Sequence, residues 1–165
     1  MRAIITTAGL GVRLRPFTQD IPKGMLEIDG KTLIERQIDI YRSCGIDDIV
    51  IIRGHEGSKV KYDDIRYYTN NKYKENGILC GGLFWEESEI EGDFIFSYSD
   101  ILFEKGAIES LIKNPSDISI IVDLAWKNSY EGRTDHPQSE AEKVYFDMYG
   151  NMKEIGKDII HKKEA

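Results

Sequence analysis

The hydrophobic residues of this chain fall into short continuous runs separated by a segment with helical spacing. Runs at 3–5 and 49–52 contain no polar residue, as expected for strands that helices bury on both faces of a sheet. Between them, the apolar positions of 31–45 share one helical face: Leu33, Ile34, Ile38, Tyr41 and Cys44. Thr32 and Glu35 have the spacing of a capping box. The pattern predicts a strand, a helix and a second strand.

The same alternation continues along the chain. Further elements are expected as strands at 65–69, 94–98 and 118–122, and as helices at 78–89 and 107–113. Strands that alternate with helices are joined by right-handed crossovers and form a parallel sheet covered by helices. Near the end, 143–148 and 152–155 flank Tyr149-Gly150-Asn151 and predict a β-hairpin. The predicted fold class is α/β: three α/β/α layers, a mostly parallel central sheet and a C-terminal β-hairpin.

Size and composition narrow the class of protein. With 165 residues, the chain is long enough for one domain with a proper core. A net charge of −7 argues against non-specific nucleic-acid binding, which needs a basic surface. Cys44 and Cys80 lack C-x-x-C spacing and suit a reducing compartment. With no long apolar run and no signal peptide before the first strand, we expect a cytoplasmic protein without membrane partners.

The most informative motif follows the first strand. It reads Ala8-Gly9-Leu10-Gly11-Val12-Arg13, with Pro22-Lys23 further on. Glycines let the backbone bend tightly and bring its N–H groups close to a phosphate. Arg13 can add a planar, bidentate donor, and Lys23 a movable point charge. A tight turn beside a solvated arginine is the plainer interpretation of Gly-x-Gly alone, but the added residues at fixed offsets favour a nucleoside triphosphate site.

Two better-known phosphate loops do not fit this segment. The dinucleotide fingerprint G-x-G-x-x-G needs a third glycine where this chain has Leu14. The P-loop ends in G-K-[ST], whereas Lys23 is followed by Gly24 and Met25. Both of these loop classes are therefore excluded for this segment.

The motif resembles the loop of the nucleotidyltransferase family, G-x-G-x-R-x-x-P-x-T followed by P-K. Every signature position is filled here: Gly9, Gly11, Arg13, Pro16, Thr18, Pro22 and Lys23. The resemblance continues through 25–35 to Asp100 and covers most of the chain. It implies a Rossmann-like fold and an enzyme that joins a nucleoside triphosphate to a phosphorylated small molecule, releasing pyrophosphate. The chain departs from the family at Thr6-Thr7, where Leu-Ala or Ala-Ala is usual.

Asp100 is the candidate metal ligand. It follows the strand at 94–98, at the carboxyl end where open α/β sheets bind their ligands. A Mg²⁺ ion that bridges triphosphate oxygens takes one or two carboxylates from the protein. A turn or N-cap aspartate is the alternative. The family resemblance, in which a strand-end aspartate holds magnesium, favours the metal.

The resemblance also implies the remaining site residues. Arg13 and Lys23 would be catalytic: Arg13 holds the triphosphate and the leaving pyrophosphate, and Lys23 stabilises charge on the α-phosphate and acceptor. The implied nucleotide-binding positions are Ala8, Gly9, Gly11, Arg13, Lys23 and Gly81. Lys157 resembles a later phosphate-contacting lysine of the family, and a solvated lysine in a charged tail is the alternative.

The acceptor is indicated by the middle of the chain. Residues 75–82 lack the Gln and Pro of the sugar-specific Q-x-x-P-x-G segment, and with 98–103 they look more like phosphocholine and 2-aminoethylphosphonate cytidylyltransferases. Glu131 and Asp135, in the polar cluster 130–137, could hold the acceptor's cation, although a charged surface loop is equally consistent. We expect a cytidylyltransferase that uses CTP, Mg²⁺ and a small phosphorylated or phosphonylated amine. A sugar-1-phosphate nucleotidyltransferase is the alternative enzyme.

Family members usually run well beyond this length. Residues 1–165 are therefore interpreted as a single nucleotidyltransferase domain that lacks the family's C-terminal part, the source of a second magnesium-binding aspartate. That leaves a hypothesis from another class, a truncated nucleotide-binding module without turnover. The chain could also form a homo-oligomer.

Overall fold

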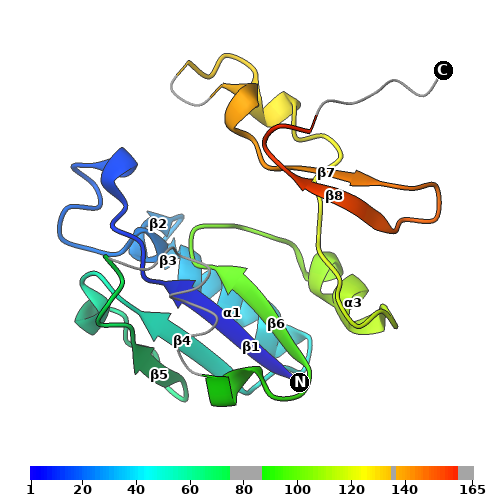
Figure 1. The fold of residues 1–165 in the computed structure, drawn as a ribbon. Coiled ribbons are helices and arrows are strands. Elements are labelled where there is room, and N and C mark those ends of the chain that lie inside the picture. The colour runs from blue at the N-terminus through cyan, green and yellow to red at the C-terminus, as the bar shows by residue number, and fades with distance from the viewer. Residues whose placement is uncertain (75–86, 135–136, 160–165) are drawn as a thin grey trace. The chain divides into compact units, whose positions relative to one another are not determined.

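The computed structural model describes residues 1–74, 87–134 and 137–159 (Figure 1). These residues belong to two compact units, 1–119 and 120–165. No helix among the described residues is long and apolar enough to cross a bilayer.

The first unit is built on a four-stranded parallel sheet in the order β5-β4-β1-β6. Its strands are β1 (Arg2–Thr7), β4 (Ile49–Arg53), β5 (Arg66–Thr69) and β6 (Phe94–Tyr98). The central strand, β1, places Ala3 opposite both Ile49 and Ile95. The apolar runs at the N-terminus and at 49–52 therefore lie side by side inside the sheet, and the predicted parallel sheet is confirmed.

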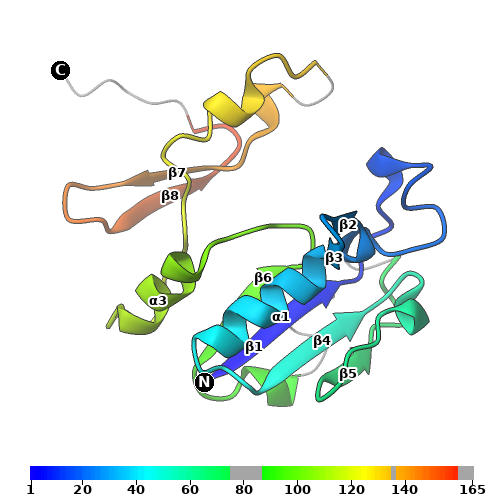
Figure 2. The same ribbon diagram turned by 180° about the vertical axis from the view of Figure 1, so that it is seen from behind.

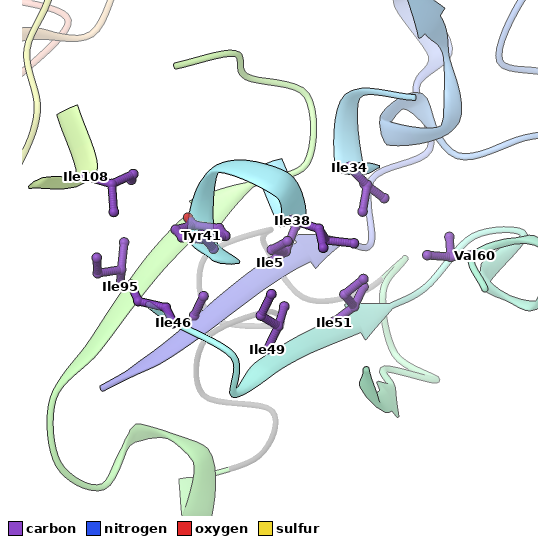
Figure 3. Packing of buried hydrophobic residues seen from close by; sticks show 11 residues of the cluster. Ile5, Ile34, Ile38, Tyr41, Ile46, Ile49, Ile51, Val60, Ile95 and Ile108 are labelled. Atoms are coloured by element: carbon purple, nitrogen blue, oxygen red, sulfur yellow. The ribbon is translucent and has the colours of Figure 1, made fainter. Parts of the chain in front are cut away.

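Helix α1 (Leu33–Ser43) covers one face of this sheet (Figure 2). It begins where the Thr32 side chain accepts a hydrogen bond of 3.1 Å from the Glu35 backbone N–H, which is the predicted N-cap. Buried side chains from the helix and the strands, among them Ile5, Ile38 and Tyr41, fill the layer between them (Figure 3). Helix α3 (Lys105–Lys113) adds Ile108 to the same core.

The opposite face of the sheet is also apolar. Ile4, Val50 and Ile52 are fully buried there, with Phe96 packed against them. The helix predicted at 78–89 falls largely on 75–86, outside the described residues. The described residues at its end belong to a turn of 3₁₀-helix, η4 (Glu87–Ile90).

The remaining short elements are antiparallel ribbons and single turns. In the first unit they are β2 (Glu27–Ile28), β3 (Lys31–Thr32), η1 (Val12–Leu14), η2 (Lys23–Met25) and η3 (Gly57–Lys59). In the second unit they are η5 (Asn128–Tyr130), η6 (Gln138–Glu140), β7 (Lys143–Phe146) and β8 (Met152–Gly156). Strands β7 and β8 pair antiparallel, so the predicted C-terminal hairpin is confirmed.

The strand predicted at 118–122 is wrong. These residues have no regular structure, and Ile118 is 83% exposed while Ile121 is 52% exposed. A strand needs a neighbour to take its backbone hydrogen bonds, and no described strand pairs with this run. The apolar, β-branched composition of this run is therefore not enough to make it a strand.

A charged network joins the amino ends of the strands. Arg2, which opens β1, forms ion pairs of 2.8 Å with Asp48 and with Glu89. Arg66, which opens β5, pairs with the same two carboxylates. Burial alone would raise the pKa of Asp48 and of Glu89, but the arginine contacts outweigh it and both pKa values are lowered. The network holds the end of the sheet that lies away from the glycine loop.

Candidate active site

A cleft of about 240 Å³ opens at the carboxyl ends of β1 and β6. It is lined by the end of β1, the glycine loop, Lys23 and the end of β6: Thr6, Thr7, Gly9, Leu10, Gly11, Val12, Arg13, Lys23, Tyr98, Ser99 and Asp100. Thr6 lies opposite Tyr98, and the Ser99 N–H donates to the Thr6 carbonyl at 3.0 Å. The parallel register therefore brings the glycine loop and Asp100 to the same edge of the sheet.

The glycine loop is held in shape by Thr18. Gly11 has a φ of 61°, a left-handed conformation that glycine adopts without strain. The fully buried Thr18 donates a 2.7 Å hydrogen bond from Oγ1 to the Gly11 carbonyl. A Cβ on Gly11 would lie 3.0 Å from Thr18 Cβ. The threonine of the motif thus closes the loop back on itself.

Two further glycines let other segments approach this loop and the end of β6. A Cβ on Gly54 would lie 2.7 Å from Ala8 Cα, so the chain after β4 packs directly on the start of the glycine loop. A Cβ on Gly24 would lie 2.7 Å from Ser99 Cβ and 2.8 Å from Ile34 Cδ1. Both are close backbone approaches that the motif alone did not identify.

The close approach at Gly24 places Lys23 beside Asp100. Lys23 Nζ donates to Asp100 Oδ2 at 2.6 Å. The side chains of Lys23 and Asp100 are 24% and 35% exposed, so the pair lies at the cleft wall within reach of solvent. An incoming ligand would meet a lysine and a carboxylate that neutralise each other.

The segment that carries Asp100 is held from below by Gln37. This side chain is 1% exposed and contacts Tyr98, Ile101 and Ser97 through three hydrogen bonds. Its sequence signal is a polar residue at position 37 on the otherwise apolar face of the predicted helix.

The cleft suits a Mg²⁺ ion that arrives with phosphates. Mg²⁺ usually keeps several waters and takes one or two carboxylates together with substrate phosphates. Asp100 supplies one such carboxylate beside a loop suited to phosphate oxygens. Among the described residues, no group of three or more His, Cys, Asp or Glu side chains could enclose a metal. The protein residues fit a partial coordination shell that a nucleotide would complete.

The structure brings some of the predicted site residues together and not others. Those that line the cleft are Gly9, Gly11, Arg13, Lys23 and Asp100, while Ala8 is buried beneath the loop against Gly54. Glu131 and Lys157 are exposed residues of the second unit. Gly81 and Asp135 lie outside the described residues. The functional roles of all these residues stay predictions.

Residues 3–137 match the family of MobA-like NTP transferase domains. CTP:phosphoglutamine cytidylyltransferase of Campylobacter jejuni is 32% identical over 167 residues, 95% of this chain and 66% of that protein. UTP–glucose-1-phosphate uridylyltransferase of Haloferax volcanii is 34% identical over 109 residues, 62% of this chain and 44% of that protein.

A solved structure of CTP:phosphocholine cytidylyltransferase from Streptococcus pneumoniae has a TM-score of 0.57 at 32% identity, covering 64% of this chain and 49% of that one. The chain thus spans between about half and two thirds of the length of these relatives, 44% to 66%.

Proposed function

The chain belongs to the family of MobA-like NTP transferase domains, and we propose that it transfers a cytidylyl group from CTP to a small phosphorylated or phosphonylated amine, releasing pyrophosphate. The observation that carries the proposal is the cleft, in which a glycine loop, Arg13 and the Lys23–Asp100 pair share one sheet edge. Two of the relatives compared above are named as CTP-dependent enzymes, which supports CTP as the nucleotide.

The nucleotide would bind with its phosphates over the loop at 9–13. Gly11 has a left-handed φ, and successive backbone N–H groups in such turns can bind anions. Arg13 lines the same cleft and can donate two parallel hydrogen bonds to phosphate oxygens. Asp100 would hold the Mg²⁺ ion that accompanies the triphosphate.

In the proposed reaction, an oxygen of the acceptor phosphate attacks the α-phosphorus. The new P–O bond forms in line as the bond to the bridging oxygen of the β-phosphate breaks, and that oxygen keeps the electron pair. A phosphate with a second pKa near 6 is already largely ionised at neutral pH, so this attack needs no general base. Positioning and neutralisation of charge account for catalysis, as in phosphoryl transfer generally.

The two cations of the cleft would contact different phosphates in this reaction. Arg13 neutralises the charge that grows on the leaving pyrophosphate. Lys23 turns from Asp100 toward the α-phosphate and holds it against the acceptor. When bound, Mg²⁺ supplies Lewis-acid stabilisation of phosphate oxygens that gain charge.

An amine-bearing acceptor would need carboxylates or aromatic faces near the cleft. Relatives named for phosphoglutamine and phosphocholine support a small phosphorylated acceptor with a nitrogen group. Glu131 and Asp135 remain our proposed contacts for that group. Neutralising Glu131 as Glu131→Gln should raise the KM for such an acceptor and leave the KM for CTP unchanged.

A sugar-1-phosphate acceptor is the second candidate, supported by the 34% identity to a UTP–glucose-1-phosphate uridylyltransferase. Pyrophosphate release measured with CTP, UTP, dTTP, ATP and GTP, each with phosphocholine, 2-aminoethylphosphonate or glucose-1-phosphate, separates the two. Faster release with UTP and glucose-1-phosphate would favour the sugar enzyme. Nucleotide binding without pyrophosphate release from any pair would favour a binding module.

A further inference from the structure

We propose that Gln37 is a positioning residue for Asp100, because its buried amide fixes the turn that carries this carboxylate. The inference rests on the proposed function, since it assigns Asp100 to a metal-bound nucleotide. Gln37 itself is 1% exposed and lies on α1, beneath the cleft, so it would act only through the backbone of the turn.

Both hydrogens of the Gln37 amide group are used on the same turn. Nε2 donates to the Tyr98 carbonyl at 2.8 Å and to the Ile101 carbonyl at 2.7 Å. These carbonyls stand on either side of Ser99 and Asp100. One planar amide therefore spans the turn and sets the distance between its two ends.

The acceptor end of Gln37 is fixed as well. Its Oε1 accepts a 3.0 Å hydrogen bond from Ser97 Oγ, a side chain on β6 that is itself buried. This contact determines which way the amide faces and keeps its Nε2 aimed at the turn. The carbonyls that it binds are backbone groups, so they remain available as acceptors whatever side chains the turn carries.

The sheet by itself does not hold Asp100. The β1–β6 ladder is extended by the bond from the Ser99 N–H to the Thr6 carbonyl, and in the described part of the chain no backbone hydrogen bond to another strand continues it at Asp100. Beyond that point the Gln37 amide takes over. Hydrogen-bonded supports of metal ligands commonly change metal affinity by about 10- to 100-fold when they are removed.

Burying the amide of Gln37 costs desolvation free energy that an apolar side chain at this position would not cost. Position 37 lies between Ile34 and Tyr41 on the buried face of α1, where methionine would fill similar space without an amide to desolvate. The three hydrogen bonds offset that cost, and their common target is the segment 97–101. Together, the three hydrogen bonds fix the turn at the cleft.

The test measures Mn²⁺ binding to the whole chain in the presence of CTP, by electron paramagnetic resonance of the free ion. Gln37→Met removes all three hydrogen bonds, Gln37→Glu keeps the shape without the donors, and Ser97→Ala removes one. Asp100→Asn defines the loss when the ligand itself is neutralised. Ile49→Val is the matched control, since it trims the buried core at the opposite end of the sheet.

We expect Gln37→Met and Gln37→Glu to weaken Mn²⁺ binding about tenfold, Ser97→Ala about twofold, and Ile49→Val not at all. Amide exchange at 99–102 should quicken in the Gln37 variants while exchange in β1 and β4 stays slow. The second Gln37 variant keeps the test available if the first does not fold.

Wild-type Mn²⁺ affinity and wild-type exchange in both folded Gln37 variants, with clear loss in Asp100→Asn, would overturn the role of Gln37 and leave the proposed function standing. Equal weakening in Ile49→Val would also overturn it, because general destabilisation would explain the effect. Wild-type protein that binds Mn²⁺ no better than Asp100→Asn would overturn both.

Discussion

Substituting Gly24 by alanine perturbs the cleft through a single methyl group. The backbone of Gly24 lies outside the left-handed region, so alanine brings no dihedral strain. The new Cβ would lie 2.7 Å from Ser99 Cβ and 2.8 Å from Ile34 Cδ1. Neither neighbour moves easily, since Ile34 is fully buried and the Ser99 N–H is hydrogen-bonded to β1. The segment at 22–24 is therefore the part that shifts.

The size of the shift follows from the contact distance. Restoring a 2.7 Å approach to an ordinary contact of 3.4 Å needs a displacement of about 0.7 Å. Such overpacking typically costs about 1–3 kcal/mol of unfolding free energy. The same displacement moves Lys23 away from its 2.6 Å contact with Asp100. Misplacement near 1 Å can lower the rate of an enzyme by about 100-fold, so we expect turnover to fall roughly 10- to 100-fold.

Urea unfolding measures the loss of stability and pyrophosphate release measures the loss of turnover, while calorimetric titration with CTP and Mg²⁺ reports nucleotide binding. Gly106→Ala is the matched control, because a Cβ at this helical glycine meets nothing within 4 Å. That control should leave nucleotide binding unchanged and should raise stability by about 0.5–1 kcal/mol. A Gly24→Ala protein as stable as wild type, with the same CTP affinity, would refute the packing argument.

Three other substitutions or conditions test separate parts of the account. Lys23→Met should weaken CTP binding but strengthen the binding of Mn²⁺ without nucleotide, because Asp100 no longer has a lysine partner. A part-exposed ion pair is worth at most about 1 kcal/mol, so the gain in Mn²⁺ affinity should be at most about fivefold. Calorimetry with each ligand alone measures these two opposite changes in affinity. Thr18→Val should lower the unfolding free energy by about 1 kcal/mol through loss of the hydrogen bond to Gly11, as urea titration would show, and an unchanged midpoint would contradict it. Asp48 and Glu89 have lower pKa values in the folded protein than in the unfolded chain, so the unfolded chain is protonated first as the pH falls. The free energy of unfolding should therefore keep its full value above about pH 5 and decrease at lower pH. Unfolding free energies at pH 7 and pH 4 measure this slope, which should flatten when Arg66 is replaced by methionine.

The sequence predicted those parts of the molecule that local patterns determine. The continuous apolar runs became β1 and β4, and Thr32 caps α1 as its spacing from Glu35 indicated. Glycines, arginine and lysine at motif spacing led to one cleft because parallel strands place their carboxyl ends together. These inferences needed the periodicity of the apolar residues, the topology of a parallel sheet and the spacing of the motif.

The parts that the sequence did not predict depend on three-dimensional neighbours. The run at 118–122 has strand composition but no described partner strand. Gly24 and Gly54 carry no motif, and their importance lies in which atoms a Cβ would meet. Gln37 could be noticed as a polar residue on an apolar face, but its hydrogen-bond partners lie about 60 residues further along the chain, with separations of 61 and 64.

Pyrophosphate release with Mg²⁺, CTP and phosphocholine or 2-aminoethylphosphonate shows whether this chain transfers a cytidylyl group to a small amine-bearing acceptor. We predict acceptor-dependent release that is faster with CTP than with the other four nucleotides. Arg13→Ala should reduce it by hundreds of fold, since loss of one charge-stabilising donor costs about 3 kcal/mol or more in the transition state. Release that is as fast in Arg13→Ala as in wild type, or faster with glucose-1-phosphate than with either amine, would contradict the account.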